Sequence, residues 1–389
     1  MKLNIAKSTR RRPTIWALTW LVALGLSASC RSTPDQPQTS PNQALSSADQ
    51  PQTPGTDEVR LLGWIGYNEE DLLQLIESRT GITVVAESFV GGDQMFATLL
   101  RHPDSYDLVV VDPEYIERLA RTEVIRPLAK SDFRFDDYFP SLREFPLSYV
   151  DSELYAVLIR FGFNGLLYNA KYLTADDVRS YGILTSEKLR GKVLLFDWYL
   201  PNMGVFSRIL GNSSSPYDLD EEKYAALKQF MSRLRPNVRT IQSDFSQMVA
   251  SLGSGDTWVQ PTAGESLTWT LRKSNPDIDW TIPEEGGVLW CETLAIPTKA
   301  RNPGGAAKVI QFLQTPEGQA ALVRRKAYIG SVPNELAYAR LTDAEKSVLK
   351  IRNSGDAEAL LRTVSIRRLP VAQPERAWQD AWTTFKAGN

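Results

Sequence analysis

The chain has 389 residues, of which 42% are hydrophobic and 23% are charged. This composition is typical of a globular protein, and the length suffices for about two domains. Lys and Arg number 44 against 46 Asp and Glu, and the formal charge of −2 argues against a nucleic-acid-binding surface. One histidine cannot form a His-rich metal site and two cysteines cannot form a site of four thiolates, so we expect no metal and no cofactor.

Residues 1–29 have the composition of an export signal. Five Lys or Arg and no acid precede a mainly apolar stretch of 12 residues, 15–26. That stretch is shorter than the roughly 20 residues of a membrane-spanning helix. The sequence LSASC at 26–30 resembles a bacterial lipoprotein signal, in which the cysteine, here Cys30, becomes the lipidated first residue. Ser27 stands where such signals prefer Leu, so lipidation and simple cleavage both stay open.

Residues 30–57 are rich in Pro, Gln, Ser and Thr and have no hydrophobic period. Such a segment has little to bury and is expected to form a flexible tether. Removal of residues 1–29 takes away five positive charges and no negative one, which moves the formal charge from −2 to −7. We therefore expect an acidic folded part in the periplasm, lipid-anchored at the outer face of the cytoplasmic membrane.

After the tether, short apolar segments alternate with helical patterns. Strands are predicted at 59–63, 82–85, 107–111, 155–159, 165–168, 192–196 and 290–296. Helices are predicted at 69–79 with Asn68 as cap, from Pro113 onward, and at 95–101, 202–210, 221–235, 306–313 and 316–327. This alternation favours parallel sheets with helices on both faces, in two α/β lobes. No Pro/Ser-rich linker separates the lobes, so the chain is predicted to cross between them more than once.

Several short motifs follow one another along the folded part. They are Trp64-x-x-Tyr67, YDLVV at 106–110, the segment 155–169, RPNV at 235–238, EGGVLWCETLAIP at 285–297 and KAG at 386–388. In order and spacing these motifs resemble the spermidine/putrescine-binding group of bacterial periplasmic solute-binding proteins, which serve ABC importers.

The resemblance implies a type II periplasmic-binding-protein fold, with two α/β lobes joined by crossover strands. Lobe 1 would comprise 58–163 plus 291–338, and lobe 2 would comprise 164–290 plus 339–389. The ligand would lie between the lobes, and a hinge motion would enclose it. The partners implied are a small-molecule ligand and an ABC permease that recognises the closed form, with the chain itself a monomer.

A polyamine site needs carboxylates for the ammonium groups and aromatic faces for the methylene groups. Trp290 and Glu292 match the family's Trp-x-acid pair, and alternate residues of a strand share a face. The family usually has Asp where Glu292 stands. Trp64 and Tyr67 match its aromatic pair after the first strand. A core Trp with a surface Glu, and simple core packing of Trp64 and Tyr67, are the structural alternatives.

Five further candidates match the family less well. Asp112 and Glu114 follow the third predicted strand, where Asp112 is equally suited to cap a helix. The family's binding acids align with Trp198 and a proline, which leaves Asp197 as the candidate substitute. Gln260 stands where the family has an aromatic wall. These departures leave undetermined which residues would form the site for the second ammonium group.

Arg160 lies in the predicted crossover segment, where the family usually has an apolar residue, and Arg367 and Arg368 fall near a ligand-contacting Gln of the family. Arginines in a cleft favour a carboxylate or other anion. Alternatively they pair with Asp112, Glu114 or Glu292. The ligand's charge therefore stays open at this point.

The function predicted from the sequence is an extracytoplasmic receptor that captures a polyamine-like molecule and delivers it to a permease. A receptor of the same class for a carboxylate-bearing or other anionic solute is the alternative. An enzyme on this fold is less well supported, because the sequence has no activated nucleophile and no cofactor motif.

Overall fold

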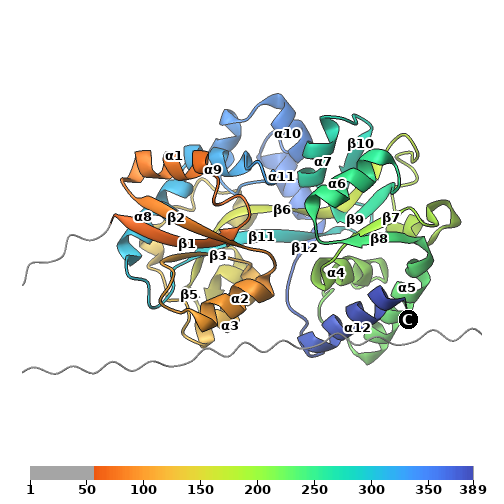
Figure 1. Cartoon of the computed structure of the whole chain (residues 1–389), viewed down its shortest axis with the longest axis horizontal. Helices are drawn as coiled ribbons and strands as arrows, with labels where there is room; N and C mark the ends of the chain where they lie inside the picture. Colours follow the sequence, from red (N-terminus) through yellow and green to blue (C-terminus); the bar gives the residue numbers. More distant parts are fainter. Residues whose placement is uncertain (1–56, 389) are drawn as a thin grey trace, which may run out of the picture. The chain divides into compact units, whose positions relative to one another are not determined.

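The computed structural model describes residues 57–388 (Figure 1). The predicted export signal and Cys30 lie outside the described residues. None of the helices within 57–388 combines the length and apolar character that a membrane crossing requires.

The first lobe is built on three parallel strands in the order β2-β1-β3. They span Glu58–Trp64 (β1), Thr83–Phe89 (β2) and Leu108–Val111 (β3). Every residue of β3 is buried, because the strand is covered on both faces. The helices of this lobe are α1 (Glu70–Thr80), α2 (Gly92–Arg101), α3 (Ile116–Arg121), α8 (Pro303–Leu313) and α9 (Pro316–Val323).

Two long strands connect this lobe to the second, as the centre of Figure 1 shows. They are β6 (Ala156–Asn169) and β11 (Gly287–Ala295), which pair antiparallel with each other. The last residues of β11 pair with β3, whereas the far end of β6 pairs with β9 and β10. A single ladder of backbone hydrogen bonds therefore runs through both lobes.

The second lobe surrounds the other end of β6. Its strands are β7 (Val193–Phe196), β8 (Val238–Gln242), β9 (Val259–Ala263) and β10 (Ile278–Thr281). Its helices are α4 (Tyr199–Ile209), α5 (Glu221–Leu234), α6 (Phe245–Ser254), α7 (Glu265–Arg272) and α12 (Glu375–Ala387). Strand β12 (Val364–Ile366) is parallel to β11 and leads through a loop to α12. The remaining elements are β4 (Tyr149–Val150), β5 (Glu153–Leu154), α10 (Asp343–Leu349) and α11 (Ser354–Leu361).

Most predicted elements are present, with four differences. Segments 155–159 and 165–168 form the single strand β6, because β11, β9 and β10 pair with it in succession. Helix α4 starts at Tyr199, which puts Pro201 in the first turn where its missing N–H costs nothing. The helix predicted at 316–327 ends at Val323, after which the chain turns toward β6. The segment from Pro113 begins as a single 3₁₀ turn rather than an α-helix.

Asn68 does not cap α1. Its side-chain oxygen accepts a hydrogen bond from the backbone N–H of Gly66 at 3.3 Å, and the N-cap residue is Glu69. Gly81 ends α1 in the left-handed conformation with φ of 71°, as expected of a C-cap glycine.

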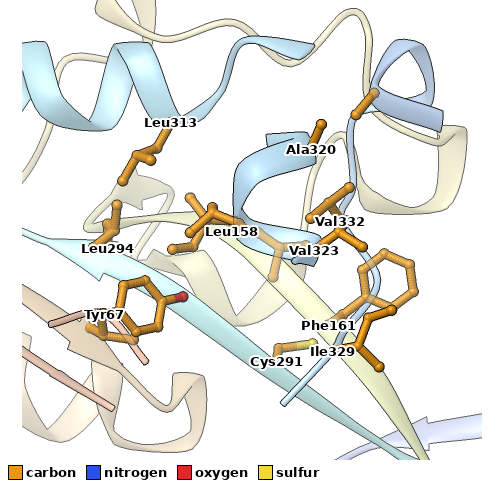
Figure 2. Packing of buried hydrophobic residues seen from close by; sticks show 14 of the residues in the cluster. Tyr67, Leu158, Phe161, Cys291, Leu294, Leu313, Ala320, Val323, Ile329 and Val332 are labelled. Atoms are coloured by element: carbon orange, nitrogen blue, oxygen red, sulfur yellow. The ribbon is translucent and has the colours of Figure 1, made fainter. Parts of the chain in front are cut away.

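Apolar side chains of β6 and β11 are part of the hydrophobic core. Figure 2 shows Leu158 and Phe161 of β6 packed near Cys291 and Leu294 of β11 and beside side chains of α9. Cys291 is 1% exposed, as expected for the residue between Trp290 and Glu292 on a strand. The residue boundaries of the two lobes given above stay a prediction.

Candidate functional site

Glu292 lies at the centre of a buried cluster on the two crossover strands. The strand register places it directly opposite Arg160, whose Nη1 lies 3.2 Å from Oε2 of Glu292. The Tyr67 hydroxyl donates to the same oxygen at 2.5 Å, and the Tyr328 hydroxyl donates to Oε1. Glu292 thus receives three donors, and neither it nor Tyr67 is a surface residue.

Arg160 is 0% exposed and is held on several sides. Its Nη2 donates to the carbonyl oxygen of Tyr328 at 2.9 Å, and its guanidinium carbon lies 4.4 Å from the centre of the Tyr328 ring. Burial alone would lower the pKa of Arg160, but the Glu292 carboxylate together with Tyr328 and Tyr67 more than offsets burial and raises the pKa. Burial, assisted by Glu292, raises the pKa of the Tyr67 hydroxyl. Arg160 therefore stays charged, and both tyrosines stay protonated as donors.

A second buried cluster joins Arg367 to Asp112 and Glu114. Nε of Arg367 donates to Glu114 at 2.6 Å, and its Nη2 lies 3.2 Å from Asp112. The Trp64 indole N–H donates to Asp112 at 3.1 Å. Asp112 makes no helix-capping hydrogen bond, so the capping alternative is not supported. Burial raises the pKa of Asp112 to about 8, although Arg367 opposes the shift.

Indole rings from both lobes meet at this second cluster. Trp64 stands at the end of β1 in the first lobe, and Trp198 follows β7 in the second. Their ring centres are 6.2 Å apart, and the guanidinium carbon of Arg367 lies 4.4 Å from the centre of the Trp198 ring. The candidate site is therefore formed by side chains of both lobes.

Gly162 of β6 makes room for two further side chains. A Cβ atom at this position would lie 1.8 Å from Oε1 of Glu265 and 2.3 Å from Cζ2 of Trp290. Glu265, the first residue of α7, is 1% exposed, and its oxygens accept the Phe163 backbone N–H at 3.3 Å. Burial raises the pKa of Glu265 to about 8. Only glycine at position 162 allows the carboxyl group and the indole to lie over the strand.

Two predicted residues do not join these clusters. Asp197 accepts from Lys386 at 2.8 Å and from the Trp382 indole N–H at 2.9 Å, so it is turned toward α12. Gln260 is buried, with its Nε2 3.7 Å from the Met248 sulfur. Its Oε1 has no hydrogen-bond partner among residues 57–388. Arg368 is exposed, unlike Arg367.

Two residues at the site were not predicted, the buried Glu265 and the partly buried Tyr328. Glu265 could have been suspected, because it is an acid at the start of a helix that follows a buried strand, where α/β sheets place ligands. Tyr328 lies in a loop with no local pattern, and only the tertiary structure brings it to Glu292. Residues 57–388 contain no group of three His, Cys, Asp or Glu arranged to hold a metal ion.

An open surface pocket of about 850 Å³ lies elsewhere, in the second lobe. None of the predicted binding residues lines it. The buried side chain in it, Arg208, donates to the carbonyl oxygens of Ser213, Glu285 and Thr363 and so links three loops. This pocket is thus separate from the candidate site.

Residues 72–347 match the model of the family described as bacterial extracellular solute-binding protein, which is more than half of the chain. The fold and the two-lobed site thus define the class, and the chain belongs to this family.

Curated relatives and solved structures agree with this assignment. The spermidine/putrescine-binding periplasmic protein of Escherichia coli (strain K12) is 28% identical over 262 residues, 65% of this chain and 72% of that protein. The putrescine/cadaverine-binding protein of Pseudomonas aeruginosa is 23% identical over 354 residues, 86% of this chain and 95% of that protein. The crystal structure of the Tp0655 (TpPotD) lipoprotein of Treponema pallidum aligns with a TM-score of 0.69 at 20% identity, over 84% of this chain and 99% of that one.

These findings confirm three predictions from the sequence. The resemblance to the spermidine/putrescine-binding group, the two-lobed α/β fold and the role of extracytoplasmic solute-binding protein are all confirmed. The individual binding residues stay predictions.

The pairing of Arg160 with Glu292 can be measured by a double-mutant cycle in urea unfolding. Arg160→Met alone is expected to lower the unfolding free energy by about 3–5 kcal/mol, because it leaves a buried carboxylate without its cation. Combined with Glu292→Gln, it should cost less than the sum of the two single changes. The same cycle on the exposed pair Arg79–Glu317 should give a much smaller coupling. Additive costs at the buried pair would contradict the assignment.

The buried Glu265 makes stability fall with rising pH. In the unfolded chain a Glu ionises near pH 4.3, whereas in the folded chain Glu265 keeps its proton to about pH 8. The folded state therefore binds the extra proton, and the unfolding free energy decreases between these pH values and levels off above them. Glu265→Gln should remove a slope of up to about 1.4 kcal/mol per pH unit in urea unfolding between pH 5 and 8.

The control for this measurement is the exposed Glu222→Gln, which should leave the pH slope unchanged. If Glu265→Gln has the same pH dependence as the unmodified protein, the carboxyl group is not buried in the way described.

Proposed function

We propose that the chain captures a small amine cation of the polyamine type between its lobes and delivers it to an ABC-importer permease. One observation carries this proposal: four buried carboxyl groups at the candidate site face only two guanidinium groups. The four are Asp112, Glu114, Glu265 and Glu292, and the guanidinium groups belong to Arg160 and Arg367. A buried ammonium needs such a carboxylate, because burial without a partner is costly. The charge of the ammonium would in turn lower the pKa of Asp112 or Glu265 from about 8 and favour the ionised form of the acid that it contacts.

The aromatic residues at the same place suit the apolar part of an amine. Trp64, Trp198 and Trp290 are each partly exposed, and the Arg367 guanidinium already lies over the Trp198 ring. A cation over such a ring gains about 0.5–2 kcal/mol, and methylene groups pack well against the same face. Polyamines combine both kinds of group.

An anionic solute is less well supported. Both guanidinium groups that would bind it are already engaged by carboxylates of the chain, Arg160 by Glu292 and Arg367 by Asp112 and Glu114. A solute anion would have to displace one of these buried carboxylates, which would then be left unpaired.

The names of relatives support the same solute class. The Escherichia coli relative is named for spermidine and putrescine, and the Pseudomonas aeruginosa relative for putrescine and cadaverine. Those names describe those proteins, and the carboxyl-rich site described above is what extends the assignment to this chain.

The proposed mechanism is capture, closure and delivery, with no bond made or broken. The solute contributes contacts to both lobes and thereby favours their closed arrangement. Crossover strands β6 and β11 are the segments that would absorb the hinge motion. The chain would act as a monomer without a cofactor, would bind no nucleic acid, and would present its closed form to the permease.

We also propose that the receptor is held at the outer face of the cytoplasmic membrane. The export signal at 1–29, Cys30 and the tether at 30–57 support this arrangement. A lipid chain with a flexible tether keeps the folded part near the permease without crossing the membrane.

The solute class can be tested by calorimetry and thermal shift on the purified mature protein. Millimolar putrescine or spermidine is expected to raise the melting temperature, because a bound ligand stabilises the folded state. Trp290→Ala and Glu292→Ala should each raise the Kd of the amine by about tenfold or more, which corresponds to a loss of about 1.4 kcal/mol or more of binding free energy. Bound amine should be recovered chemically unchanged.

The matched control is Trp269→Ala, which removes a partly exposed indole of α7 and should leave amine affinity unaltered. If neither amine changes the melting temperature, the polyamine assignment fails while the family assignment stands.

The anchor can be tested by expressing the full chain and a Cys30→Ser variant in a bacterial host. The unmodified protein is expected in the membrane fraction and in the detergent phase of a phase separation. Cys30→Ser should abolish both, because no thiol remains for lipidation at that position. Recovery of the unmodified protein in the soluble periplasmic fraction would instead indicate simple cleavage.

A further inference from the structure

Arg367 lies in the loop between β12 and α12, and its guanidinium group contacts groups that a bound cation would need. It is 4% exposed, contacts carboxylates of the first lobe and stacks on an indole of the second. Two carboxylates with an aromatic face are the recognition elements of an amine. The chain thus supplies its own cation at this place.

The two carboxylates are not fully satisfied by this cation. Oδ2 of Asp112 and Oε2 of Glu114 are buried and have no hydrogen-bond partner within residues 57–388. One guanidinium carries one charge, so it cannot balance both acids when they are ionised. Asp112 and Glu114 are therefore the acids of a cation subsite, and the cation that lies between them is Arg367.

The other carboxyl groups of the site differ in what they contact. Glu292 is paired with Arg160 on the facing strand. Glu265 contacts the backbone N–H of Phe163 and lies beside Trp290, and within the described chain no salt bridge reaches it. Of the four carboxyl groups, Glu265 alone is left without a cationic partner from the protein.

We infer that Arg367 is a specificity-determining residue, a built-in occupant of the subsite formed by Asp112, Glu114 and Trp198. It restricts the solute to one that places a single cationic group in the site, beside Glu265 and Trp290. This inference rests on the proposed function and refines its substrate class, from polyamines in general to amines bound through one ammonium group.

The test compares two probes that differ by one ammonium group, 1-butylamine and putrescine, by calorimetry. In the unmodified protein the two affinities should agree within about threefold. In Arg367→Met the second ammonium can take the vacated place, and putrescine should be preferred by about tenfold or more. Arg367→Lys keeps a cation there and should preserve the ratio of the unmodified protein.

Two results would overturn the inference. One is a tenfold preference for putrescine in the unmodified protein, and the other is an unchanged ratio in Arg367→Met. If Arg367→Met does not fold by itself, it is refolded with putrescine present, and failure to fold there also counts against the inference.

A second measurement does not depend on the proposed function. Arg367→Ala leaves a vacant place between two carboxylates, and millimolar methylguanidinium should raise its melting temperature by several degrees but not that of the unmodified protein. The matched control is Arg325→Ala. Arg325 is also buried and also pairs with two carboxylates, but these are Glu69 and Asp71 and do not belong to the candidate site. Equal stabilisation of both variants, or of neither, would overturn the inference.

The two failures are distinguishable. If no amine binds any variant but methylguanidinium selectively stabilises Arg367→Ala, the proposed function fails and the cation subsite stands. If amines bind and the ratio does not respond to Arg367, the proposed function stands and the inference fails.

Discussion

The cost of burying charge is the constraint on which the site depends. Removing an ion from water costs several kcal/mol, and only a close counter-charge with further hydrogen bonds offsets it. Arg160 and Glu292 meet this requirement because the register of β6 and β11 places them opposite each other. The tyrosines that complete the cluster come from two distant loops, Tyr67 after β1 and Tyr328 after α9. Satisfying one carboxylate thereby fixes the position of both loops.

The same two strands also contribute apolar side chains to the hydrophobic core. Phe161 and Cys291 alternate with Arg160, Glu292 and Trp290 and pack among apolar side chains (Figure 2). A one-residue slip between the strands would move Glu292 from its place opposite Arg160 and leave both buried charges without this partner. The register is therefore held both by apolar packing and by the charge pair, and the site and the core cannot be altered independently.

The sequence allowed the buried strands to be predicted, because runs such as 107–111 have an unambiguous pattern. The sequence pattern divides strand β6 in two, because Arg160, Gly162 and Asn164 interrupt its apolar run. Of these residues, Arg160 belongs to the site and Gly162 makes room for it. Two of the residues that break the strand pattern, Arg160 and Gly162, thus lie at the candidate site.

The site was predicted less completely, for a related reason. Trp64, Tyr67, Trp290 and Glu292 lie in short motifs and were identified from them. Which acid pairs with which arginine depends on strand register and on loops hundreds of residues apart, such as Arg367 with Glu114. Residue type alone allowed both a solute-binding acid and an internally paired one, and in the structure Asp112, Glu114 and Glu292 pair with arginines of the chain.

The thiol of Cys291 has a consequence for the protein's life outside the cytoplasm. It is the free cysteine of the described chain, and burial raises its pKa well above the usual value. Thiolate is the reactive form, so this side chain is protected from oxidation and from disulfide exchange while the strands stay paired. An oxidant therefore reaches this thiol only when β11 separates from its neighbours, so the rate of Cys291 oxidation reports how often that separation occurs.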